Sequence, residues 1–325
     1  MPIRGECEAN HEFTRMNTNR IYIKVGVIFV VIVTFAASVF SQRSRPAPQT
    51  NPSTQSLDEK IQLALAGFQG KAWIYAKNLD TGKDYALRAD EQTRTASTIK
   101  LAIMAETFHQ VAQGKLKWDD GIELTKEKKQ GGSGILFEFS DGTKIDLQTA
   151  LHLMIVVSDN TATNLVLDEV GTDNVNTFMD SLGLTDIKSM RKIGGGNESK
   201  AFADPRNKLF GLGRSSPRQM VRLIEMMDNG ELVSKEASAE MIAILKRQQY
   251  KDGIGRGVPD TIPVASKSGA LDRFRADVGI IYTRRGRIAM EIVLDDMRVV
   301  AYDQENPGLA MLWKLSQILQ DGLGR

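Results

Sequence analysis

The apolar residues near the N-terminus form one continuous block. Val25 to Phe40 is a 16-residue stretch without a charged side chain, and it follows Arg15 and Arg20. The apolar part of a secretory signal usually has ~7–15 residues, whereas a helix that spans a bilayer needs ~20. The stretch lies between these lengths. Residues 1–40 are therefore interpreted either as a cleaved signal peptide or as a segment that anchors the protein in the membrane through residues 21–40. Both interpretations predict an exported protein, periplasmic or secreted, in the second case tied to the inner membrane.

The pattern changes twice after this block. Residues 41–56 are rich in Pro, Ser, Thr and Gln, which leave nothing to bury, so this segment is predicted to be a disordered linker. From Leu57 onward, apolar residues recur at helical and strand spacing in turn. Helices are predicted over 57–69, 97–113, 147–170 around a polar break, 216–227 and 307–319, and strands over 71–79, 84–88, 261–266, 277–283 and 287–295.

The order of these elements predicts an α+β fold. Consecutive strands joined by short turns favour an antiparallel sheet, which the first and last helices can cover. We divide the predicted folded domain, 57–325, into an α/β lobe over 57–96 and 216–325 and an all-helical lobe over 97–215. Clefts that bind ligands tend to lie at the seam between two such lobes, and we expect the site there.

Composition excludes several classes of function. The 42 Lys and Arg residues nearly balance the 40 Asp and Glu residues, giving a net charge of +2, which argues against nucleic acid as a partner. The single cysteine, Cys7, precedes the apolar block, so the folded part has neither a disulfide nor a thiol nucleophile. The three histidines, His11, His109 and His152, have no metal-ligand spacing, and we expect no metal and no cofactor.

A first candidate for chemistry is Ser97-Thr98-Ile99-Lys100 at the start of a predicted helix. Residues three apart on a helix face the same side, so Lys100 can reach the Ser97 hydroxyl. A lysine in a partly desolvated cleft loses its proton more easily and can then activate a weak nucleophile. The same spacing recurs at Ser189 and Lys192, where no partner residues follow, and we treat that match as chance.

Two further motifs follow in order. Ser158-Asp159-Asn160 interrupts an apolar run; Ser158 or Asp159 can cap the next helix, Ser158 can pass a proton to a leaving nitrogen, and Asn160 can hold a substrate carbonyl. Lys267-Ser268-Gly269 ends an extended stretch. Its cation and hydroxyl suit a substrate carboxylate, and its glycine permits close approach of a backbone.

These three motifs together resemble the class A β-lactamases among the penicillin-recognising serine hydrolases. Further matches are Gly132 to Ile135, Ser158 to Asn164, Lys267 to Ala270 and Asp277 to Gly279. The resemblance covers about residues 57–323. It implies a β-lactamase/transpeptidase-like fold. It also implies that the protein is a monomer and acts on a β-lactam or a cell-wall peptide.

The resemblance also implies a role for each matched residue. Ser97 would be the nucleophile, Lys100 its base or proton shuttle, Ser158 the proton donor to the leaving nitrogen, and Asn160 the group that orients Lys100 and the substrate amide. Lys267 and Ser268 would bind the substrate carboxylate beside Gly269, and the N–H groups of Ser97 and Ala270 would form the oxyanion hole. Arg275 is a candidate second cation for the carboxylate.

The sequence departs from the family at one place. Class A enzymes carry a deacylating glutamate in an E-x-x-x-N segment, and residues 190–217 contain none. Glu198 and Asp204 are the carboxylates available there, acting either as a relocated base or only as solvated charges. Three functions therefore stay open: a β-lactamase, a penicillin-binding D-alanyl-D-alanine carboxypeptidase, and a sensor that is acylated and released slowly.

Overall fold

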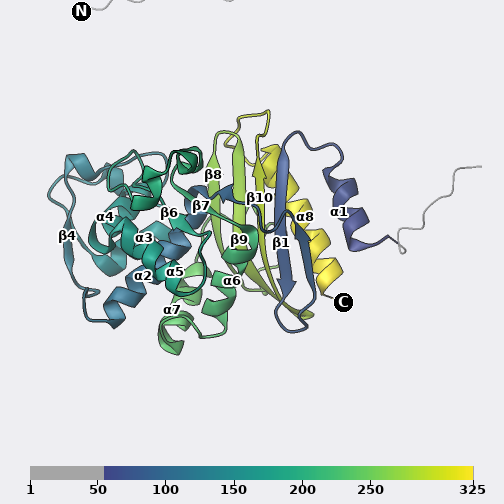
Figure 1. Ribbon diagram of the computed structural model, residues 1–325, viewed down its shortest axis with the longest axis horizontal. Helices are drawn as coiled ribbons and strands as arrows, with labels where there is room; N and C mark the ends of the chain where they lie inside the picture. The colour runs from purple at the N-terminus through teal and green to yellow at the C-terminus, as the bar shows by residue number, and fades with distance from the viewer. Residues whose placement is uncertain (1–54, 325) are drawn as a thin grey trace, which may run out of the picture. The chain divides into compact units, whose positions relative to one another are not determined.

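The structure is a computed structural model that describes residues 55–324 (Figure 1). The predicted signal or anchor over 21–40 lies outside the described residues, as does all of the predicted linker except Gln55 and Ser56. Of the helices within 55–324, none combines the length and the apolar character that crossing a bilayer requires.

A five-stranded antiparallel sheet forms the centre of the α/β part, as the sequence predicts. Its order is β2-β1-β10-β9-β8, so β8 is an edge strand, and in Figure 1 it lies on the side of the helical part. The strands are β1 (Lys71–Asn78), β2 (Asp84–Leu87), β8 (Val264–Leu271), β9 (Phe274–Thr283) and β10 (Gly286–Asp295).

The β8–β9 hairpin is longer than predicted. The sequence indicates strands that end at Ser266 and begin at Asp277, whereas pairing continues to Leu271 opposite Phe274. This continuation places the whole Lys267-Ser268-Gly269 motif inside the edge strand. The polar residues of the motif do not follow the apolar alternation by which a strand is recognised in the sequence.

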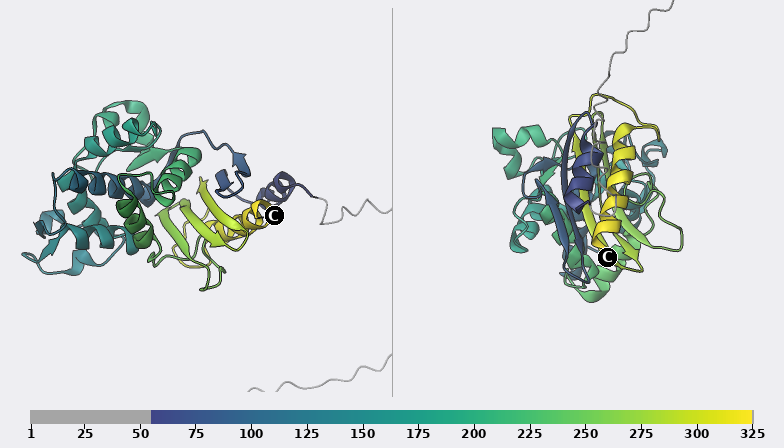
Figure 2. Two further views of the ribbon diagram at one scale, coloured as in Figure 1. Left: turned by 90° about the horizontal axis from the view of Figure 1, so that it is seen from below. Right: turned by 90° about the vertical axis from the view of Figure 1, so that its right-hand side faces the viewer.

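Helices α1 (Leu57–Leu65) and α8 (Pro307–Leu323) lie side by side on one face of the sheet (Figure 2). Ser56 caps α1 and forms a reciprocal capping box with Glu59, which satisfies two of the free N–H groups at the helix start. Ile61 and Leu319 are among the residues that bury this face. The predicted covering of the sheet by the first and last helices is confirmed.

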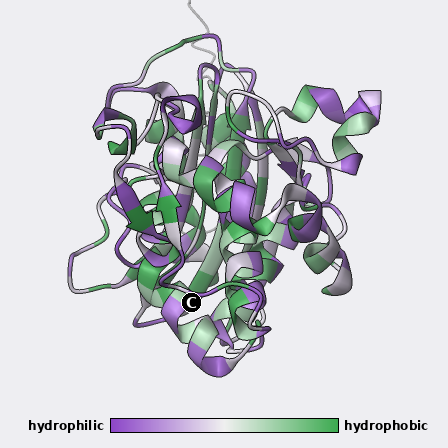
Figure 3. Cartoon of the chain, turned by 90° about the vertical axis from the view of Figure 1, so that its left-hand side faces the viewer, coloured by the Kyte–Doolittle hydropathy of each residue, from purple (hydrophilic) through white to green (hydrophobic). Residues whose placement is uncertain are grey.

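The other face of the sheet packs against the helical part through one continuous core that includes Ala265, Val278 and Leu223. These helices alternate hydrophobic and hydrophilic segments, as expected for amphipathic elements (Figure 3). They are α2 (Lys100–Ala112), α3 (Leu147–Val156), α4 (Asn160–Val170), α5 (Thr172–Ser181), α6 (Pro217–Asp228) and α7 (Lys235–Leu245).

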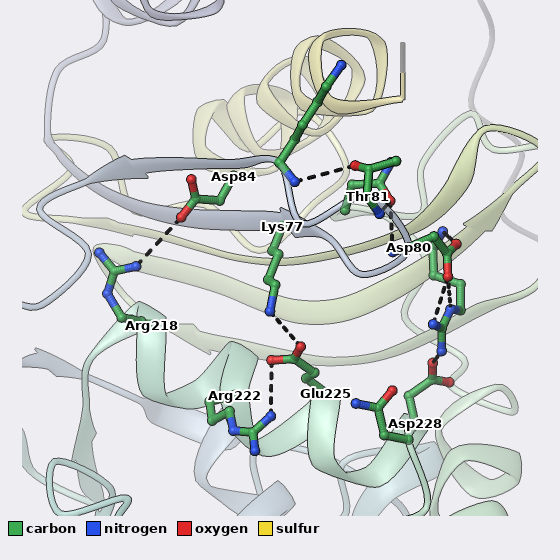
Figure 4. Close-up of polar contacts among 12 residues, drawn as sticks. Lys77, Asp80, Thr81, Asp84, Arg218, Arg222, Glu225 and Asp228 are labelled. Carbon is green, nitrogen blue, oxygen red and sulfur yellow. Dashed lines mark hydrogen bonds and ion pairs between the residues drawn. The ribbon is translucent and has the colours of Figure 1, made fainter.

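Ion pairs at the rim of the sheet hold α6 in place (Figure 4). Lys77 Nζ lies 2.7 Å from Glu225 Oε1, and Arg287 Nη1 lies 2.7 Å from Asp228 Oδ2. Both helix carboxylates are largely buried, at 11% and 7% side-chain exposure, so these pairs are screened less than surface pairs. These two ion pairs hold α6 against β1 and β10.

Two small sheets complete the helical part. One has the order β3-β7-β6 and the other pairs β4 with β5. Their strands are β3 (Thr93–Arg94), β6 (Lys188–Ser189), β7 (Gly213–Ser215), β4 (Gly121–Glu123) and β5 (Lys144–Asp146).

Candidate active site

Ser97 lies in a 3₁₀ turn, Ala96–Ile99, that runs directly into α2. The neighbouring side chains Thr98 and Ile99 are buried, while Ser97 is partly exposed and accessible to a substrate. Ala96 has a φ of 46°, which is unusual for a residue with a Cβ atom and stores strain next to the candidate nucleophile. The turn is therefore held by its surroundings in a conformation that its own sequence disfavours.

Lys100, one turn after Ser97, is completely buried. Its Nζ donates to the Ser158 backbone oxygen at 2.7 Å, to Ser158 Oγ at 3.1 Å and to Asn160 Oδ1 at 3.2 Å. Burial, together with the nearby charge of Lys267, lowers the pKa of Lys100 well below its usual value. Burial thus favours the neutral amine, the form that a general base requires.

The segment from Ser158 to Asn160 joins α3 to α4. Asp159 is the N-cap of α4, as predicted for this segment, and its Oδ1 accepts from the Ala162 N–H at 2.8 Å. Its other oxygen accepts from the Ile135 N–H at 2.7 Å, which ties the 130–136 loop to the turn. Ser158 has a φ of 53°, so a second residue of the site is held in a strained conformation.

Asn160 connects three parts of the site. Its amide oxygen accepts from Lys100, its amide nitrogen donates to the Gly131 oxygen at 2.9 Å, and its backbone N–H donates to the Ser133 oxygen at 3.0 Å. The side chain is fixed from both ends and can orient Lys100 without searching rotamers.

Lys267 on β8 approaches Ser158 from the side of the sheet. Its Nζ donates to Ser158 Oγ at 3.0 Å and to the Ser268 backbone oxygen at 2.8 Å, and the side chain is fully buried. Burial lowers the pKa of Lys267 to about 7, with the charge of Asp277 acting in the opposite direction. The structure thus brings Lys100, Ser158, Asn160 and Lys267 into one hydrogen-bonded cluster.

Gly269 allows β8 to lie against the turn that carries Ser97. A Cβ atom at this position would come within 2.7 Å of the Thr95 oxygen and 3.2 Å of the Ser97 nitrogen. Ala270 follows Gly269 and is exposed. Since β8 approaches Ser97 this closely, the N–H groups of Ser97 and Ala270 belong to neighbouring segments, as an oxyanion hole requires.

Arg275 lies on β9 opposite Ala270 and is 3% exposed. Its guanidinium donates to the backbone oxygens of Leu271 and Phe274, each at 2.6 Å, and to that of Ala301. It also stacks on the Tyr302 ring at 5.0 Å. Because these contacts hold the 298–302 segment to the hairpin, we assign Arg275 no role toward a substrate carboxylate.

Neither carboxylate of the 190–217 segment contacts the cluster. Glu198 is exposed, and Asp204 Oδ2 forms an ion pair with Arg206 Nη2 at 2.7 Å. Hydrogen bonds from Arg206 lower the pKa of Asp204 to about 2, so this group is a poor proton acceptor at neutral pH. The second serine–lysine match is also apart from the site, because Ser189 is buried in β6 and Lys192 pairs with Asp168.

The contact that sequence reasoning missed joins Asn164 to Ile193. The Asn164 Nδ2 donates to the Ile193 oxygen and its Oδ1 accepts from the Ile193 N–H, both at 2.9 Å. Asn164 lies one helical turn after Asn160, on the same face of α4. The 190–217 segment is therefore held to α4 at Ile193, an aliphatic residue. The sequence does hold one signal for this contact, because Asn164 is a polar residue one helical turn beyond the polar break at Ser158 to Asn160.

Candidate metal ligands are scarce. Within residues 55–324, no group of three or more His, Cys, Asp and Glu side chains is placed to hold a metal ion.

Comparisons with known proteins agree with this geometry. A model of the beta-lactamase enzyme family matches residues 56–323, which include every residue of the cluster. The chain belongs to the beta-lactamase enzyme family. Among curated relatives, a β-lactamase of Bacillus licheniformis is 27% identical over 270 residues, covering 81% of this chain and 83% of that protein. The VEB-1 β-lactamase of Pseudomonas aeruginosa is 21% identical over 272 residues, covering 81% and 86%.

Solved structures of β-lactamases and penicillin-binding proteins share the fold. A β-lactamase from Sphaerobacter thermophilus superimposes with a TM-score of 0.72 at 28% identity, covering 83% of this chain and 97% of that one. The penicillin-binding protein PBP-A superimposes with a TM-score of 0.70 at 23% identity, covering 82% and 94%. The fold is therefore that of β-lactamases and penicillin-binding proteins, as the sequence predicts.

Proposed function

We propose that this member of the beta-lactamase enzyme family opens the β-lactam amide through an ester formed on the Ser97 hydroxyl. The observation that carries the proposal is the position of Ser158 Oγ, 3.1 Å from Lys100 Nζ and 3.0 Å from Lys267 Nζ. A hydroxyl in contact with Lys100 can take a proton from that lysine and pass it to the leaving nitrogen, which amide cleavage requires.

The proposed acylation step uses Ser97 together with the members of this cluster. Neutral Lys100 takes the proton of Ser97, whose oxygen attacks the carbonyl carbon, and the N–H groups of Ser97 and Ala270 stabilise the oxyanion. The carbon–nitrogen bond then breaks, and the leaving nitrogen takes a proton from Ser158, which Lys100 replaces. The cationic Lys267 and the Ser268 hydroxyl hold the substrate carboxylate during both events.

Release of the acyl group requires water and a second general base. Such a base typically contributes ~10²–10⁴ in rate. The contact between Asn164 and Ile193 supports slow release, because the residue of the 190–217 segment that is held to α4 carries an aliphatic side chain and no carboxylate. We therefore expect an acyl-enzyme that accumulates.

This expectation supports a second candidate function, a penicillin-binding D-alanyl-D-alanine carboxypeptidase. A leucine-to-glutamate mutant of PBP-A forms an acyl-enzyme complex with penicillin G. A peptide ending in D-alanine offers the same arrangement of an amide next to a terminal carboxylate. Acylation would then release D-alanine.

A chromogenic cephalosporin tests the proposal on residues 55–325. We expect a burst of one equivalent per protein, followed by turnover at least ~10²-fold slower than the burst. Fast turnover without a burst would support an efficient β-lactamase, and release of D-alanine from a pentapeptide would favour the carboxypeptidase. A protein that shows neither burst nor turnover would contradict acylation of Ser97.

A further inference from the structure

An ion pair ties the chain just before Ser97 to the large sheet. Arg94 ends β3, three residues before Ser97, and Asp295 ends β10. Arg94 Nε donates to Asp295 Oδ2 at 2.9 Å, and Arg94 Nη2 donates to Asp295 Oδ1. The guanidinium therefore binds the carboxylate through two nitrogens, which fixes its orientation as well as its position. We call this ion pair the Arg94–Asp295 clamp.

Both partners of the clamp are partly enclosed. Their side chains are 30% and 14% exposed, so solvent screens this pair less than a surface pair. The Arg94 guanidinium also lies 5.4 Å from the centre of the ring of Phe274, the first residue of β9. The neighbouring carboxylate, Asp296, is paired with Lys71 at 2.7 Å, which leaves Asp295 to hold Arg94.

The strained residue of the Ser97 turn lies directly beyond the clamp. Ala96 has a φ of 46°, and its side chain packs in a small buried core with Phe274 and Val293. Phe274 therefore lies against both Arg94 and Ala96. A positive φ is disfavoured by the alanine Cβ, so contacts from outside the turn must hold this conformation. The clamp supplies such a contact from the side of the sheet.

We propose that Arg94 and Asp295 are positioning residues for Ser97. Their ion pair holds the strained turn in the conformation that keeps the Ser97 nitrogen beside Gly269 on β8. The proposal rests on the proposed function, since it takes Ser97 as the nucleophile, and the clamp itself touches none of the reacting atoms. Loss of the clamp reduces the fraction of molecules whose turn is competent, and acylation slows by that fraction.

Acylation by the chromogenic cephalosporin, followed at several concentrations, separates the limiting rate from binding. We expect Arg94→Gln and Asp295→Asn each to lower the limiting rate by roughly 10-fold, within the range that release of one strained residue allows. The double variant should be no slower than either single variant, because both remove the same contact. The half-saturating concentration should change by less than about 2-fold, since Lys267 and Ser268 are proposed to hold the carboxylate without the clamp.

Arg287→Gln is the matched control. Arg287 lies at the opposite end of β10, and the side chains of its ion pair with Asp228 are 34% and 7% exposed, similar to those of the clamp. This variant should lower the urea midpoint of unfolding and leave the limiting acylation rate unchanged. An equal fall of the rate in the control, or an unchanged rate in both clamp variants, would overturn the proposal.

Ala96→Gly tests whether the clamp acts through the strained turn. Glycine adopts a φ of 46° without a Cβ penalty, so the turn no longer needs an outside hold. Ala96→Gly should therefore raise the limiting rate of Arg94→Gln several-fold and change that of the wild type little. Arg88→Gly, at an exposed residue with a φ of 53°, controls for general stabilisation and should not raise it. No recovery with Ala96→Gly, or equal recovery with Arg88→Gly, would contradict this mode of action.

Hydrogen exchange tests the clamp independently of acylation. If the cephalosporin does not acylate Ser97, the proposed function fails, and exchange of the 94–100 segment, measured by mass spectrometry of peptic peptides, then decides for the clamp alone. Exchange should be faster in Arg94→Gln than in the wild type and unchanged in Arg287→Gln. Equal exchange in Arg94→Gln and the wild type would show that the clamp does not hold the turn.

Discussion

At the scale of single residues, the site depends on burying amines. Lys100 and Lys267 are both fully buried and share Ser158 Oγ as a partner. A buried ammonium is costly, and the molecule responds by favouring the neutral form of each lysine. Lys100 must be neutral to act as a base, while Lys267 must be charged to hold a carboxylate. The pH therefore sets the fraction of molecules that can be acylated.

We predict a pH-dependent rate of acylation with a descending limb near pH 7. The pKa of Lys267 is lowered to about 7, so above that pH the carboxylate partner is lost in the free enzyme. The second-order acylation rate reports the free enzyme and should fall there. Lys267→Arg, which stays charged, should move the limb to higher pH. A flat profile from pH 6 to 9 in the wild type would contradict this assignment.

A second prediction concerns Ile193. Ile193→Glu places a carboxylate at the point where Asn164 ties the segment to α4, and it should speed deacylation by roughly 10²-fold, the lower end of general-base assistance. Steady-state hydrolysis of the chromogenic cephalosporin measures the effect. Ile193→Gln has nearly the same shape without the charge and should leave deacylation slow. Equal rates for both variants would exclude a role of position 193 in release.

At the scale of elements, β8 has two functions at once. It is an edge strand paired only with β9, and it carries Lys267, Ser268 and Gly269. The resemblance to class A β-lactamases, carried by the three motifs in their order, implied that these residues share a site with Ser97. It did not indicate that the strand continues to Leu271, since strand patterns are read from apolar alternation.

Substituting Gly269 tests the approach of β8 to the Ser97 turn. An alanine Cβ would meet the Thr95 oxygen at 2.7 Å and the Ser97 nitrogen at 3.2 Å, so the strand must move away. We expect Gly269→Ala to lower the acylation rate by ~10²–10³, as for loss of one oxyanion-hole donor. Gly67→Ala, where an added Cβ meets nothing within 4 Å, is the control for folding. Unchanged acylation in Gly269→Ala would disprove the close approach.

What the sequence could not predict depends on packing between distant elements. The link from Asn164 to Ile193 joins α4 to a loop 29 residues away, and no local pattern specifies it. Helix α7 also escaped prediction, although Ser234 caps it. Arg275 resembled a substrate-binding cation from its position after the third motif. Its backbone partners, which depend on how the 298–302 segment folds back, could not be read from the chain.

At the scale of the whole molecule, one sheet supports both the site and a buried acid. Asp277 on β9 is 1% exposed, accepts from the Ile254 N–H at 3.0 Å with Oδ2, and leaves Oδ1 without a hydrogen bond. Glu291 on β10 is also buried, and burial raises the pKa of both groups. The division into an α/β lobe and a helical lobe, the monomeric state and export through residues 21–40 stay predictions.

The stability of the molecule should reflect Asp277. Burial raises the pKa of Asp277 from its usual 3.8 to about 7, so its protonated form stabilises the fold below pH 3.8, and this stability is lost as the pH rises toward 7. We expect the free energy of unfolding of the wild type, relative to Asp277→Asn, to fall between pH 4 and 7 by at most ~1.4 kcal/mol per pH unit. Urea denaturation at several pH values measures it. A difference independent of pH would contradict the buried-acid assignment.

The central claim, that Ser97 forms an ester with a β-lactam, has one direct test. The folded domain is incubated with penicillin G, its intact mass is measured, and the modified peptide is sequenced by tandem mass spectrometry. The account predicts one adduct per protein, equal to the mass of penicillin G, located on Ser97 and absent from Ser97→Ala. No adduct on the wild type, or an adduct that persists in Ser97→Ala, would contradict it.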